Sequence, residues 1–405
     1  MRKQLLVITI VGSIMTAGYF FLPNEATTEF DSQNLKSEVV STTRQETEKE
    51  VTPEKIITHI ETPENVIGVY FTNWAAGTKS YQDKLENIIN TTDVNTVVID
   101  IKDYTGKIGF KTDNVLINEV GSSEERIKNI EEYFNYLHSK NIYIIGRLAV
   151  FQDTHYVNKY PEVAVKTLDG KVWRDRKKIP WVEAGNEEYW NYILEVAKES
   201  YKIGFDEINF DYIRFPSDGN MKDISYAHMN GRTRRDVMKS FYEFLNKNMK
   251  EAEITHSADL FGLVTTATDD LGIGQYLEDA LPNFDYIMPM VYPSHFADGW
   301  YNIPKPGKEP GKVIRLSMEK ALERTITAGY DATKLRPWIQ DFDLGAIYTE
   351  QLVKDQIQAS LDLGKSSFIL WDPAIKYQLG ALQIDEYKIK KADVQTESLS
   401  ENKLE

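Results

Sequence analysis

The stretch "GFDEINFDYIRFP", residues 204–216, reads as a buried β-strand that carries a carboxylate near its end. Its apolar side chains are Ile208, Phe210, Ile213 and Phe215. Pro216 cannot donate a further ladder hydrogen bond, so the strand ends before it. Because an unpaired charge in an apolar setting costs several kcal/mol, Asp211 needs neighbours that make its burial tolerable. The surroundings of this strand therefore decide both the fold and the function.

Seven further segments share this character, being short runs rich in apolar, β-branched or aromatic residues. They are "VIGVYFT" 66–72, "TVVIDIK" 96–102, "IYIIGRL" 142–148, "ITHSADL" 254–260, "DYIMPMV" 285–291, "LRPWIQD" 335–341 and "SSFILWD" 366–372. Helical patterns such as 124–140 and 233–249 lie between them. Nearly continuous apolar strands that alternate with helices indicate a parallel sheet covered on both faces.

Eight such units predict an α/β fold, namely a closed (β/α)8 TIM barrel. The rival is an open, doubly wound sheet. No glycine-rich phosphate turn follows the first strand, 66–72, so the barrel is favoured.

The composition limits the classes of ligand. The 405 residues are 41% hydrophobic and 12% aromatic, enough for one large core or two smaller ones. A net charge of −15 and a pI near 5.1 argue against nucleic acid or an anionic membrane surface as the main partner. With no cysteine and six histidines, none at a spacing such as HxxxH, the sequence predicts no metal site and no cofactor.

The two ends of the chain differ from its middle. Arg2 and Lys3 precede an uncharged apolar run, which predicts a signal or an N-terminal membrane anchor in residues 1–22, the anchor being favoured. Residues 23–63 are rich in Thr and Glu, which predicts a disordered acidic linker, and residues 386–405 form a similar polar tail. The expected organisation is one barrel domain over 64–385, extracytoplasmic, and either membrane-anchored or secreted.

Polar side chains end almost every predicted strand, at the rim where barrel enzymes place their chemistry. They are Asp100, Lys102, Arg147, Asp211, Asp259, Tyr292, Asp341 and Asp372. Because side chains alternate along a strand, Asp211 and Asp259 lie opposite the apolar face and should point into the barrel mouth. Repulsion and partial burial should raise the pKa of at least one of them, so that one carboxyl is an acid while another stays ionised. Arg147 and Arg214 are expected to hold selected carboxylates in the charged form.

Each of these aspartates has a structural alternative. A strand-end Asp is more often a cap satisfied by backbone amides, and "WDPA" around Asp372 fits that pattern. For Asp211 the functional interpretation is favoured, because Arg and Pro follow it in an apolar frame. For Asp259 the two interpretations are evenly matched. Of Asp341 and Asp343 in "WIQDFD", one is a candidate cap for the segment that follows.

Two long loops, 149–187 and 293–317, carry an unusual number of aromatic residues. These are Trp173, Trp181, Phe296, Trp300 and Tyr301. Aromatic rings on exposed loops suit the C–H faces of sugar rings. For Trp173 and Trp300, packing of the loop itself is an equally good interpretation. The loop lysines, Lys177 among them, are expected to form a solvated face rather than an anion site.

The order of the strand motifs resembles that of a known family. The motifs are "GVYFTNW", "VVIDIKDYTGKI", "IIGRLAVFQD", "EINFDYIRFP", "SADLFG", "DYIMPMVYPSHF", "WIQDF" and "FILWDP". Over residues 65–380 they resemble a domain of unknown function whose members are predicted glycoside hydrolases with an α-amylase-like barrel. The string "NFDYIRFP" is the most specific part of the resemblance.

The resemblance implies roles strand by strand. Amylase-type barrels carry an Asp nucleophile on strand four, an acid/base on strand five and a sugar-binding Asp on strand seven, which implies Asp211, Asp259 and Asp341 respectively. Two features depart from that pattern. Arg214 follows the expected nucleophile, whereas amylases have an Arg before it, and strand five ends in Asp where amylases use Glu. The acid is therefore less firmly assigned than the nucleophile.

The leading hypothesis is hydrolysis of a cell-surface or extracellular polysaccharide by two carboxylates, with retention. The residues assigned to substrate binding are Asp100, Lys102, Arg147, Trp173, Arg214, Tyr292, Trp300 and Trp371. The first alternative is a non-catalytic glycan-binding barrel at the cell surface, which would bind oligosaccharides without releasing reducing ends. The second is metal-dependent hydrolysis or deacetylation at a cluster such as Asp269–Asp270.

Overall fold

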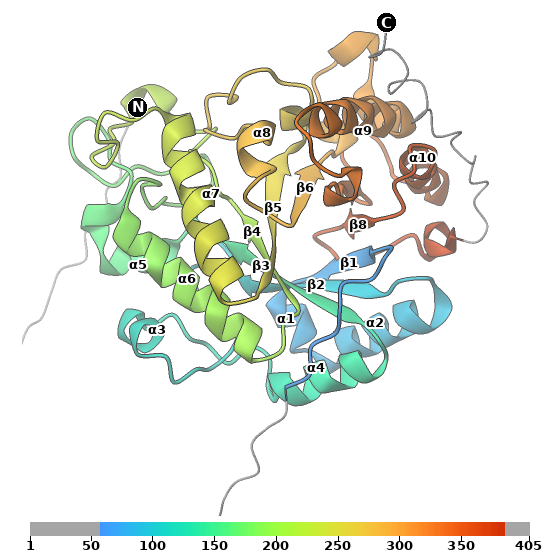
Figure 1. The fold of residues 1–405 in the computed structure, drawn as a ribbon, viewed down its shortest axis with the longest axis horizontal. Coiled ribbons are helices and arrows are strands. Elements are labelled where there is room, and N and C mark those ends of the chain that lie inside the picture. The colour runs from blue at the N-terminus through green and yellow to red at the C-terminus, as the bar shows by residue number, and fades with distance from the viewer. Residues whose placement is uncertain (1–56, 385–405) are drawn as a thin grey trace, which may run out of the picture. The chain divides into compact units, whose positions relative to one another are not determined.

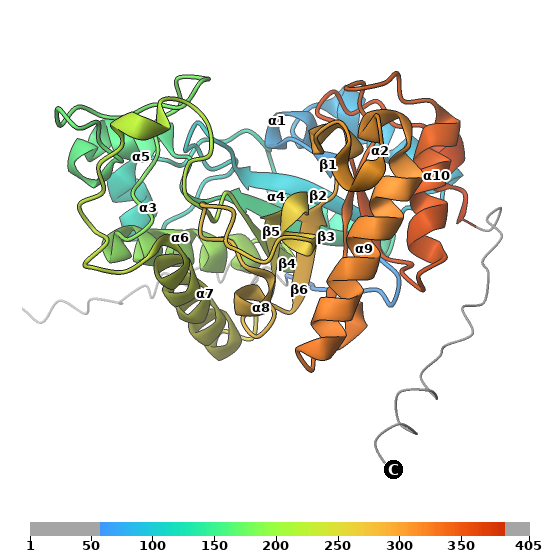
Figure 2. The ribbon, with the colours of Figure 1, turned by 90° about the horizontal axis from the view of Figure 1, so that it is seen from above.

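The computed structural model describes residues 57–384; the predictions for 1–22, for 386–405 and for most of the linker 23–63 lie outside the described residues. Eight parallel strands pair in chain order, and the last pairs with the first to close a barrel. The predicted (β/α)8 TIM barrel is therefore confirmed. Figure 1 and Figure 2 show helices α6 and α7 on one side of the strands, with α9 and α10 on the other.

All eight predicted strands are present. They are β1 Ile67–Phe71, β2 Thr96–Lys102, β3 Tyr143–Ala149, β4 Glu207–Asp211, β5 Thr255–Phe261, β6 Tyr286–Met290, β7 Trp338–Gln340 and β8 Phe368–Trp371. Every residue of β2, β3 and β4 is buried. Continuous burial of this kind explains why these segments read as apolar runs rather than as alternating ones.

The helices between the strands are α1 Asn73–Ala76, α2 Lys79–Thr91, α3 Val115–Val120, α4 Ile130–Ser139, α5 Thr154–Lys159, α6 Glu187–Lys202, α7 Arg234–Glu251, α8 Leu277–Ala280, α9 Pro310–Thr327 and α10 Glu350–Leu361. The helix expected over 233–249 is α7, whose start is fixed by a capping box between Thr233 and Asp236. The helix expected over 124–140 begins later, at Ile130, because Asn129 before it adopts a left-handed conformation with φ 50°.

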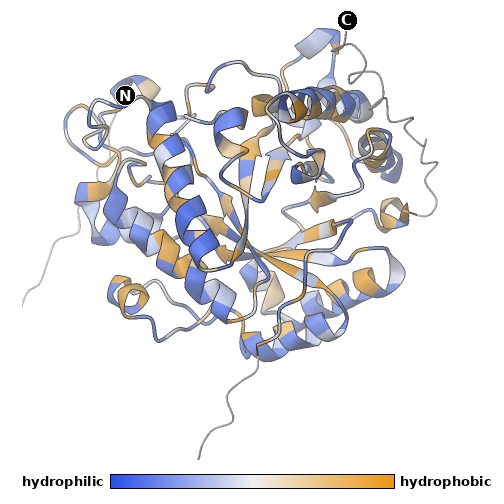
Figure 3. Cartoon of the chain, viewed as in Figure 1, coloured by the Kyte–Doolittle hydropathy of each residue, from blue (hydrophilic) through white to orange (hydrophobic). Residues whose placement is uncertain are grey.

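The apolar residues form two main layers. In β1, Val69 and Phe71 belong to the cluster between the strands and the helices, whereas Tyr70 between them belongs to a smaller cluster. That smaller cluster consists of Val66, Tyr70, Val98, Tyr143, Ile145, Met288, Tyr292, Trp338 and Ile369, and their alternation along the strands places it inside the barrel. In Figure 3 the central strands are mostly hydrophobic, and the helices carry hydrophilic stripes.

Residues just before β1 contact the barrel. The amide of Ile60 donates to Asp206 Oδ1 at 3.0 Å, the hydroxyls of Thr62 and Tyr143 are 2.9 Å apart, and the ring of His59 stacks at 4.0 Å on a tyrosine of α6. Ordered contacts therefore begin before the predicted domain boundary at residue 64. Within 57–384, every helix is too short or too polar to cross a bilayer.

Candidate active site

A cavity of about 530 Å³ lies at the carboxyl ends of the strands. Its lining includes six of the eleven residues that the sequence predicts for the site, namely Arg147, Asp211, Arg214, Asp259, Tyr292 and Trp371. These residues come from segments more than 200 positions apart in the chain. The closed parallel barrel brings them together because all its strands end at the same rim.

Asp211 is the last residue of β4 and is 4% exposed. Its Oδ2 accepts hydrogen bonds from Arg147, from Nε at 3.0 Å and also from Nη2. Its Oδ1 accepts one at 2.6 Å from the amide of Tyr212, which adopts a left-handed conformation with φ 54°. Non-glycine residues held in this conformation cluster at functional sites. Three N–H donors thus stabilise a carboxylate anion at Asp211.

Asp259 in β5 faces the same cavity and is 1% exposed. Its Oδ1 accepts hydrogen bonds from Trp338 Nε1 at 2.7 Å and from Asn209 Nδ2 at 2.9 Å. Its Oδ2 lies 3.8 Å from Arg147 Nε. Burial raises the pKa of Asp259 well above its usual range, and the negative charge of Asp211 raises it further. The arrangement favours a neutral acid that carries its proton on Oδ2.

Arg147 connects the carboxylates. It pairs in register with Asp100 of β2 and Asn209 of β4, and its long side chain extends from that layer toward the rim. Its Nη1 donates to Asp100 Oδ1 at 2.7 Å, while Asp100 Oδ2 accepts a hydrogen bond from the hydroxyl of Tyr70 at 2.5 Å. Burial raises the pKa of Asp100, although Arg147 opposes that shift. Asp100 therefore positions Arg147 and is not itself part of the cavity lining.

Aromatic side chains form one wall of the cavity. The ring of Trp371 lies 5.1 Å from Arg147 Cζ and stacks on Tyr70 at 4.0 Å. Tyr292 also lines the cavity, and burial raises the pKa of its hydroxyl well above the usual range, so the hydroxyl keeps its proton. The structure shows no hydrogen bond from that hydroxyl to a described residue. Both residues can therefore contact a ligand, as the sequence predicts.

Asp341, predicted to bind sugar, lies outside the cavity lining. In β7, Trp338 and Gln340 share the inner face, and Asp341, at the next alternating position, points away from it. Its Oδ2 accepts a hydrogen bond at 2.8 Å from the amide of Gln378. Burial raises the pKa of Asp341 to about 8. The structure thus gives one oxygen of this carboxyl a backbone contact, while Oδ1 is buried without a hydrogen-bond partner among the described residues.

Lys102, Trp173 and Trp300 also lie outside the lining. A shift of register between Asp100 and Lys102 turns the lysine away from the barrel interior, and its Nζ donates to Asp153 Oδ2 at 2.7 Å. Trp173 is 2% exposed, and its indole N–H donates to a backbone carbonyl. The ring of Trp300 packs on Phe296 at 4.5 Å. The prediction of substrate contact is therefore not supported for Lys102 and Trp173, because their side chains are fully buried in other contacts.

Three residues at the site were not predicted from the sequence. Trp338 and Asn209 both donate to Asp259, and Tyr70 donates to Asp100. A signal for Trp338 exists in "LRPWIQD", where alternation separates it from Ile339. Asn209 shares a strand face with Asp211 for the same reason. Tyr70 has the same signal, because it alternates with Val69 and Phe71 in "GVYFT".

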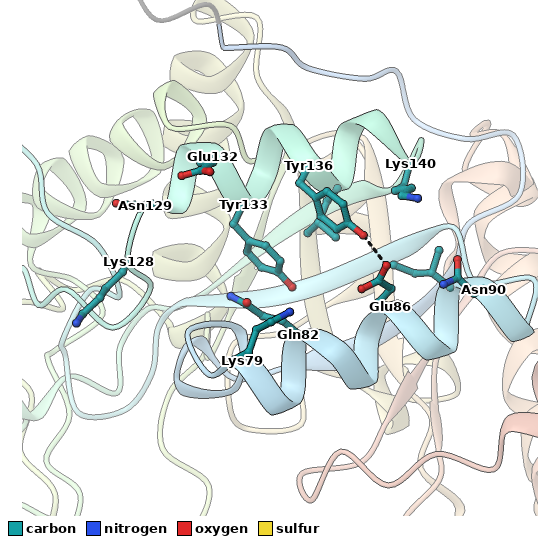
Figure 4. A pocket seen from close by; sticks show the side chains of 12 residues that line it. Lys79, Gln82, Glu86, Asn90, Lys128, Asn129, Glu132, Tyr133, Tyr136 and Lys140 are labelled. Atoms are coloured by element: carbon teal, nitrogen blue, oxygen red, sulfur yellow. Dashed lines mark hydrogen bonds between the residues drawn. The ribbon is translucent and has the colours of Figure 1, made fainter.

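A second cavity, of about 480 Å³, lies between α2 and α4, away from this rim. Figure 4 shows that charged, polar and aromatic side chains line it. Glu86 of α2 accepts a hydrogen bond from the hydroxyl of Tyr136 of α4 at 2.8 Å, and Glu132 also lies on α4. Glu132 is exposed and Glu86 is half-buried, so neither has the burial that raises the pKa of Asp259. Within residues 57–384, no group of three or more His, Cys, Asp or Glu is placed to hold a metal ion.

A family model described as "Putative glycosyl hydrolase domain" matches residues 68–377. The chain belongs to this family. The resemblance drawn from the strand motifs is thereby confirmed over nearly the same residues, and the protein is a glycoside hydrolase by family. No curated protein is significantly similar to the chain.

Several solved structures resemble this glycoside hydrolase. A hypothetical protein from Ruminiclostridium thermocellum ATCC 27405 is 32% identical over 51% of this chain and 98% of that one, with a TM-score of 0.44. The glycoside hydrolase domain of PgaB (BpsB) from Bordetella bronchiseptica is 11% identical, covers 80% of this chain and 99% of that one, and has a TM-score of 0.56. α-L-Fucosidase isoenzyme 2 from Paenibacillus thiaminolyticus is 10% identical, covers 79% of this chain and 48% of that one, and has a TM-score of 0.54. At such identities the last two show a shared fold.

Proposed function

We propose that this protein hydrolyses glycosidic bonds in a cell-surface or extracellular polysaccharide, with Asp211 as nucleophile and Asp259 as general acid and base. The observation that carries the proposal is the pairing of these two carboxyls in one cavity with opposite environments. Three N–H donors stabilise the anion of Asp211. Burial beside that anion raises the pKa of Asp259. Two carboxyls held in different protonation states are what glycoside hydrolysis requires.

The first step would form a covalent intermediate. The Asp211 carboxylate attacks the anomeric carbon while the bond from that carbon to the departing oxygen breaks, and Asp259 Oδ2 donates its proton to that oxygen. In the second step a water molecule attacks the same carbon from the vacated side. Asp259 takes the proton of the water, and the ester to Asp211 breaks. Two displacements at one carbon give overall retention of configuration.

The other cavity residues orient this chemistry. Arg147 donates to Asp211 and lies 3.8 Å from Asp259 Oδ2, so one guanidinium fixes both carboxyls. Trp371 lines the cavity beside Arg147 and offers an apolar contact to a sugar, and the hydroxyl of Tyr292 is available as a donor to it. Asp341 has no assigned part in catalysis here, since it does not line the cavity.

The location of the substrate rests on the sequence. The apolar run in residues 1–22 and the polar segment after it are those of a chain that leaves the cytoplasm anchored or secreted. An extracytoplasmic barrel with a cavity of about 530 Å³, open at its rim, is suited to polymers that stay outside the cell. A polysaccharide or oligosaccharide is therefore the proposed partner.

The test is to incubate the purified full-length chain with a panel of bacterial surface polysaccharides and to identify products by mass spectrometry. NMR of the first-formed product should show the anomeric configuration of the substrate. Asp211→Asn should release no product while keeping the wild-type melting temperature. Binding of a polymer without release of reducing ends by the wild type would favour the glycan-binding alternative instead.

A further inference from the structure

The cavity has a second charged region beside the carboxylates, formed by Arg214 and Lys177. Arg214 follows β4 and is 7% exposed, and Lys177 is an exposed residue of the segment between α5 and α6. Both line the cavity. Among the described residues, neither side chain takes part in an ion pair. The sequence predicts that Lys177 belongs to a solvated face, whereas the structure places it at the cavity.

Arg214 is rigidly held without a carboxylate partner. Its Cζ lies 4.8 Å from the ring of Trp181 and 4.5 Å from that of Phe261. Its Nη1 donates to Phe215 O at 3.0 Å and to Ser217 Oγ at 3.1 Å. The structure shows no hydrogen bond from Nε or Nη2 to a described residue. A fixed guanidinium with this edge open is suited to donate two parallel hydrogen bonds to an anion.

One buried carboxylate, Asp175, hydrogen-bonds both the turn that carries Lys177 and the tryptophan that packs on Arg214. Its Oδ1 accepts hydrogen bonds from the amides of Lys177 and Ile179, each at 2.9 Å, which shapes the turn that carries the lysine. Its Oδ2 accepts one at 3.1 Å from the indole of Trp181, the ring against which Arg214 packs. Asp175 is thus satisfied by these donors. The two cations are positioned by a common element rather than by chance.

The position of Arg214 relates it to the reacting bond. The ring of Tyr212 lies 5.3 Å from Arg214 Cζ and 5.9 Å from Arg147 Cζ, so the two guanidiniums contact the same ring. Arg147 in turn holds Asp211. A group bound at Arg214 would therefore belong to the reacting sugar or to its neighbour. Asp211, Asp218 and Asp175 act on Arg214 from a distance, but no described carboxylate forms an ion pair with it. In a chain of net charge −15, a buried cation left unpaired at this place fits a ligand that brings the negative charge itself.

We propose that the cavity selects sugars that carry an anionic substituent, a carboxylate or a phosphate, which Arg214 and Lys177 bind while Asp211 and Asp259 act on the adjacent glycosidic bond. The inference rests on the proposed function for the choice of a saccharide. The anion contact itself requires no turnover, so the two claims can be tested separately.

The experiment measures binding of three matched probes to the full-length chain carrying Asp211→Asn, which leaves the probes intact. They are methyl glucuronide, methyl glucoside 6-phosphate and the neutral methyl glucoside, which differ only at carbon 6. At least one charged probe should bind at least about tenfold more tightly than the neutral one, as expected for charge-assisted hydrogen bonds. That preference should weaken as salt is added. The probe that binds more tightly identifies the substituent as carboxylate or phosphate.

Substitutions then locate the contact. In the same background, Lys177→Gln and Arg214→Met should each reduce the preference for the charged probe severalfold, and together they should abolish it. Lys178→Gln is the matched control, because Lys178 is exposed in the same turn and does not line the cavity. It should leave the preference unchanged. If Arg214→Met fails to fold, Lys177→Gln alone decides, since its side chain is exposed.

Equal affinity for all three probes, or no measurable binding of either charged one, would overturn the proposal. So would a preference that survives both substitutions. Hydrolysis is a separate outcome. If no polysaccharide is cleaved but the charged probe binds through Lys177 and Arg214, the anion site stands and the hydrolytic mechanism fails. If acidic and neutral polymers are cleaved equally well, the mechanism stands and the anion site fails.

Discussion

The barrel interior contains two charged clusters that differ in their balance of charge. At the carboxyl end of the strands, the carboxyls of Asp100, Asp211 and Asp259 share the single guanidinium of Arg147. At the amino end, Glu207 and Arg336 pair one to one, with Arg336 Nη1 at 3.0 Å from each carboxylate oxygen. Both clusters are almost fully buried. Burial alone, therefore, does not distinguish a reactive carboxyl from a structural one.

In the amino-end cluster the Glu207 carboxylate is satisfied by its surroundings, although Arg336 Nε has no hydrogen-bond partner among the described residues. Glu207 Oε1 also accepts a hydrogen bond from Ser257 Oγ at 2.6 Å, and Oε2 accepts one from the hydroxyl of Tyr143 at 3.0 Å. Arg336 lies 3.9 Å above the ring of Tyr286. The carboxyl-end cluster has more acid than base, so at least one carboxyl must hold a proton to remain buried. We expect loss of a residue from the amino-end cluster to affect folding, and loss of one from the carboxyl-end cluster to affect turnover.

The largest expected effect is that of Asp211→Asn on turnover. The variant removes the nucleophile and the charge that raises the pKa of Asp259, and kcat on the cleaved polymer should fall about a thousandfold or more. Glu207→Gln is the matched control, since it makes the same change four residues earlier in the same strand. Its activity per folded molecule should stay near that of the wild type. Equal losses of kcat in the two variants would contradict the division between the clusters.

The next effect concerns stability at the amino end. Arg336→Met leaves Glu207 buried without its cation, which typically costs about 3–5 kcal/mol of unfolding free energy. Adding Glu207→Gln to that variant should recover part of the loss, because the uncompensated charge is gone. Urea denaturation of the two single variants and the double variant measures the coupling. Strictly additive losses would show that the pair is not a unit.

A smaller effect, on pH dependence, is expected from Arg147→Gln. Hydrolysis requires Asp259 to carry a proton, so kcat/KM falls as pH rises through the pKa of that residue. The charge of Arg147 lowers the pKa of Asp259. Without it, the basic limb of the profile should move to higher pH, while the maximum falls because Asp211 loses two donors. Arg235→Gln, which breaks an ion pair on α7 outside the cavity, serves as control; a shift to lower pH would contradict the assignment of the acid.

The same rule, alternation along a strand, predicted part of the site and explains why Asp341 lies outside the cavity lining. It places Asp211 and Asp259 in the barrel, as the structure shows. Applied to "LRPWIQD", it places Trp338 inside and Asp341 on the face of Ile339, toward the helices. The assignment of Asp341 came instead from its place at the end of strand seven in the amylase pattern. A position at the end of a strand determines how far along the barrel axis a residue lies, but not whether its side chain faces the barrel interior or the helices.

Other differences depend on contacts that the local sequence does not specify. Alternation alone would place Lys102 beside Asp100, but a change of register against β3 turns it outward. Such a bulge depends on the partner strand. Trp173 is buried because its loop folds back on itself, with an antiparallel bridge between Lys166 and Val172. The eight strands, by contrast, were predictable because each is buried along its whole length or nearly so.

The smallest expected effect is that of Asp341→Asn, which tests whether the carboxyl group outside the cavity differs from the two inside. The pKa of Asp341 is raised from its ordinary 3.8 to about 8, so its carboxyl is neutral at pH 7. The amide of Asn has the same shape and charge as that neutral form. Turnover should therefore remain within about twofold of the wild type. A loss comparable to that of Asp211→Asn would show that the residue acts on the substrate, as the family resemblance implies.

The free energy of unfolding of the wild type should fall as pH rises, and Asp341→Asn should remove the part of that fall that is due to Asp341. The raised pKa means that the folded state retains a proton which the unfolded state loses, so the contribution of Asp341 is complete below pH 3.8 and is lost as pH rises through about 8. Asn cannot ionise, so the variant lacks this loss. Each unit of pKa shift corresponds to about 1.4 kcal/mol, and a relative gain of at least that size is expected above pH 8 in urea denaturation. Parallel pH profiles for variant and wild type would mean that the carboxyl is solvated in the folded protein.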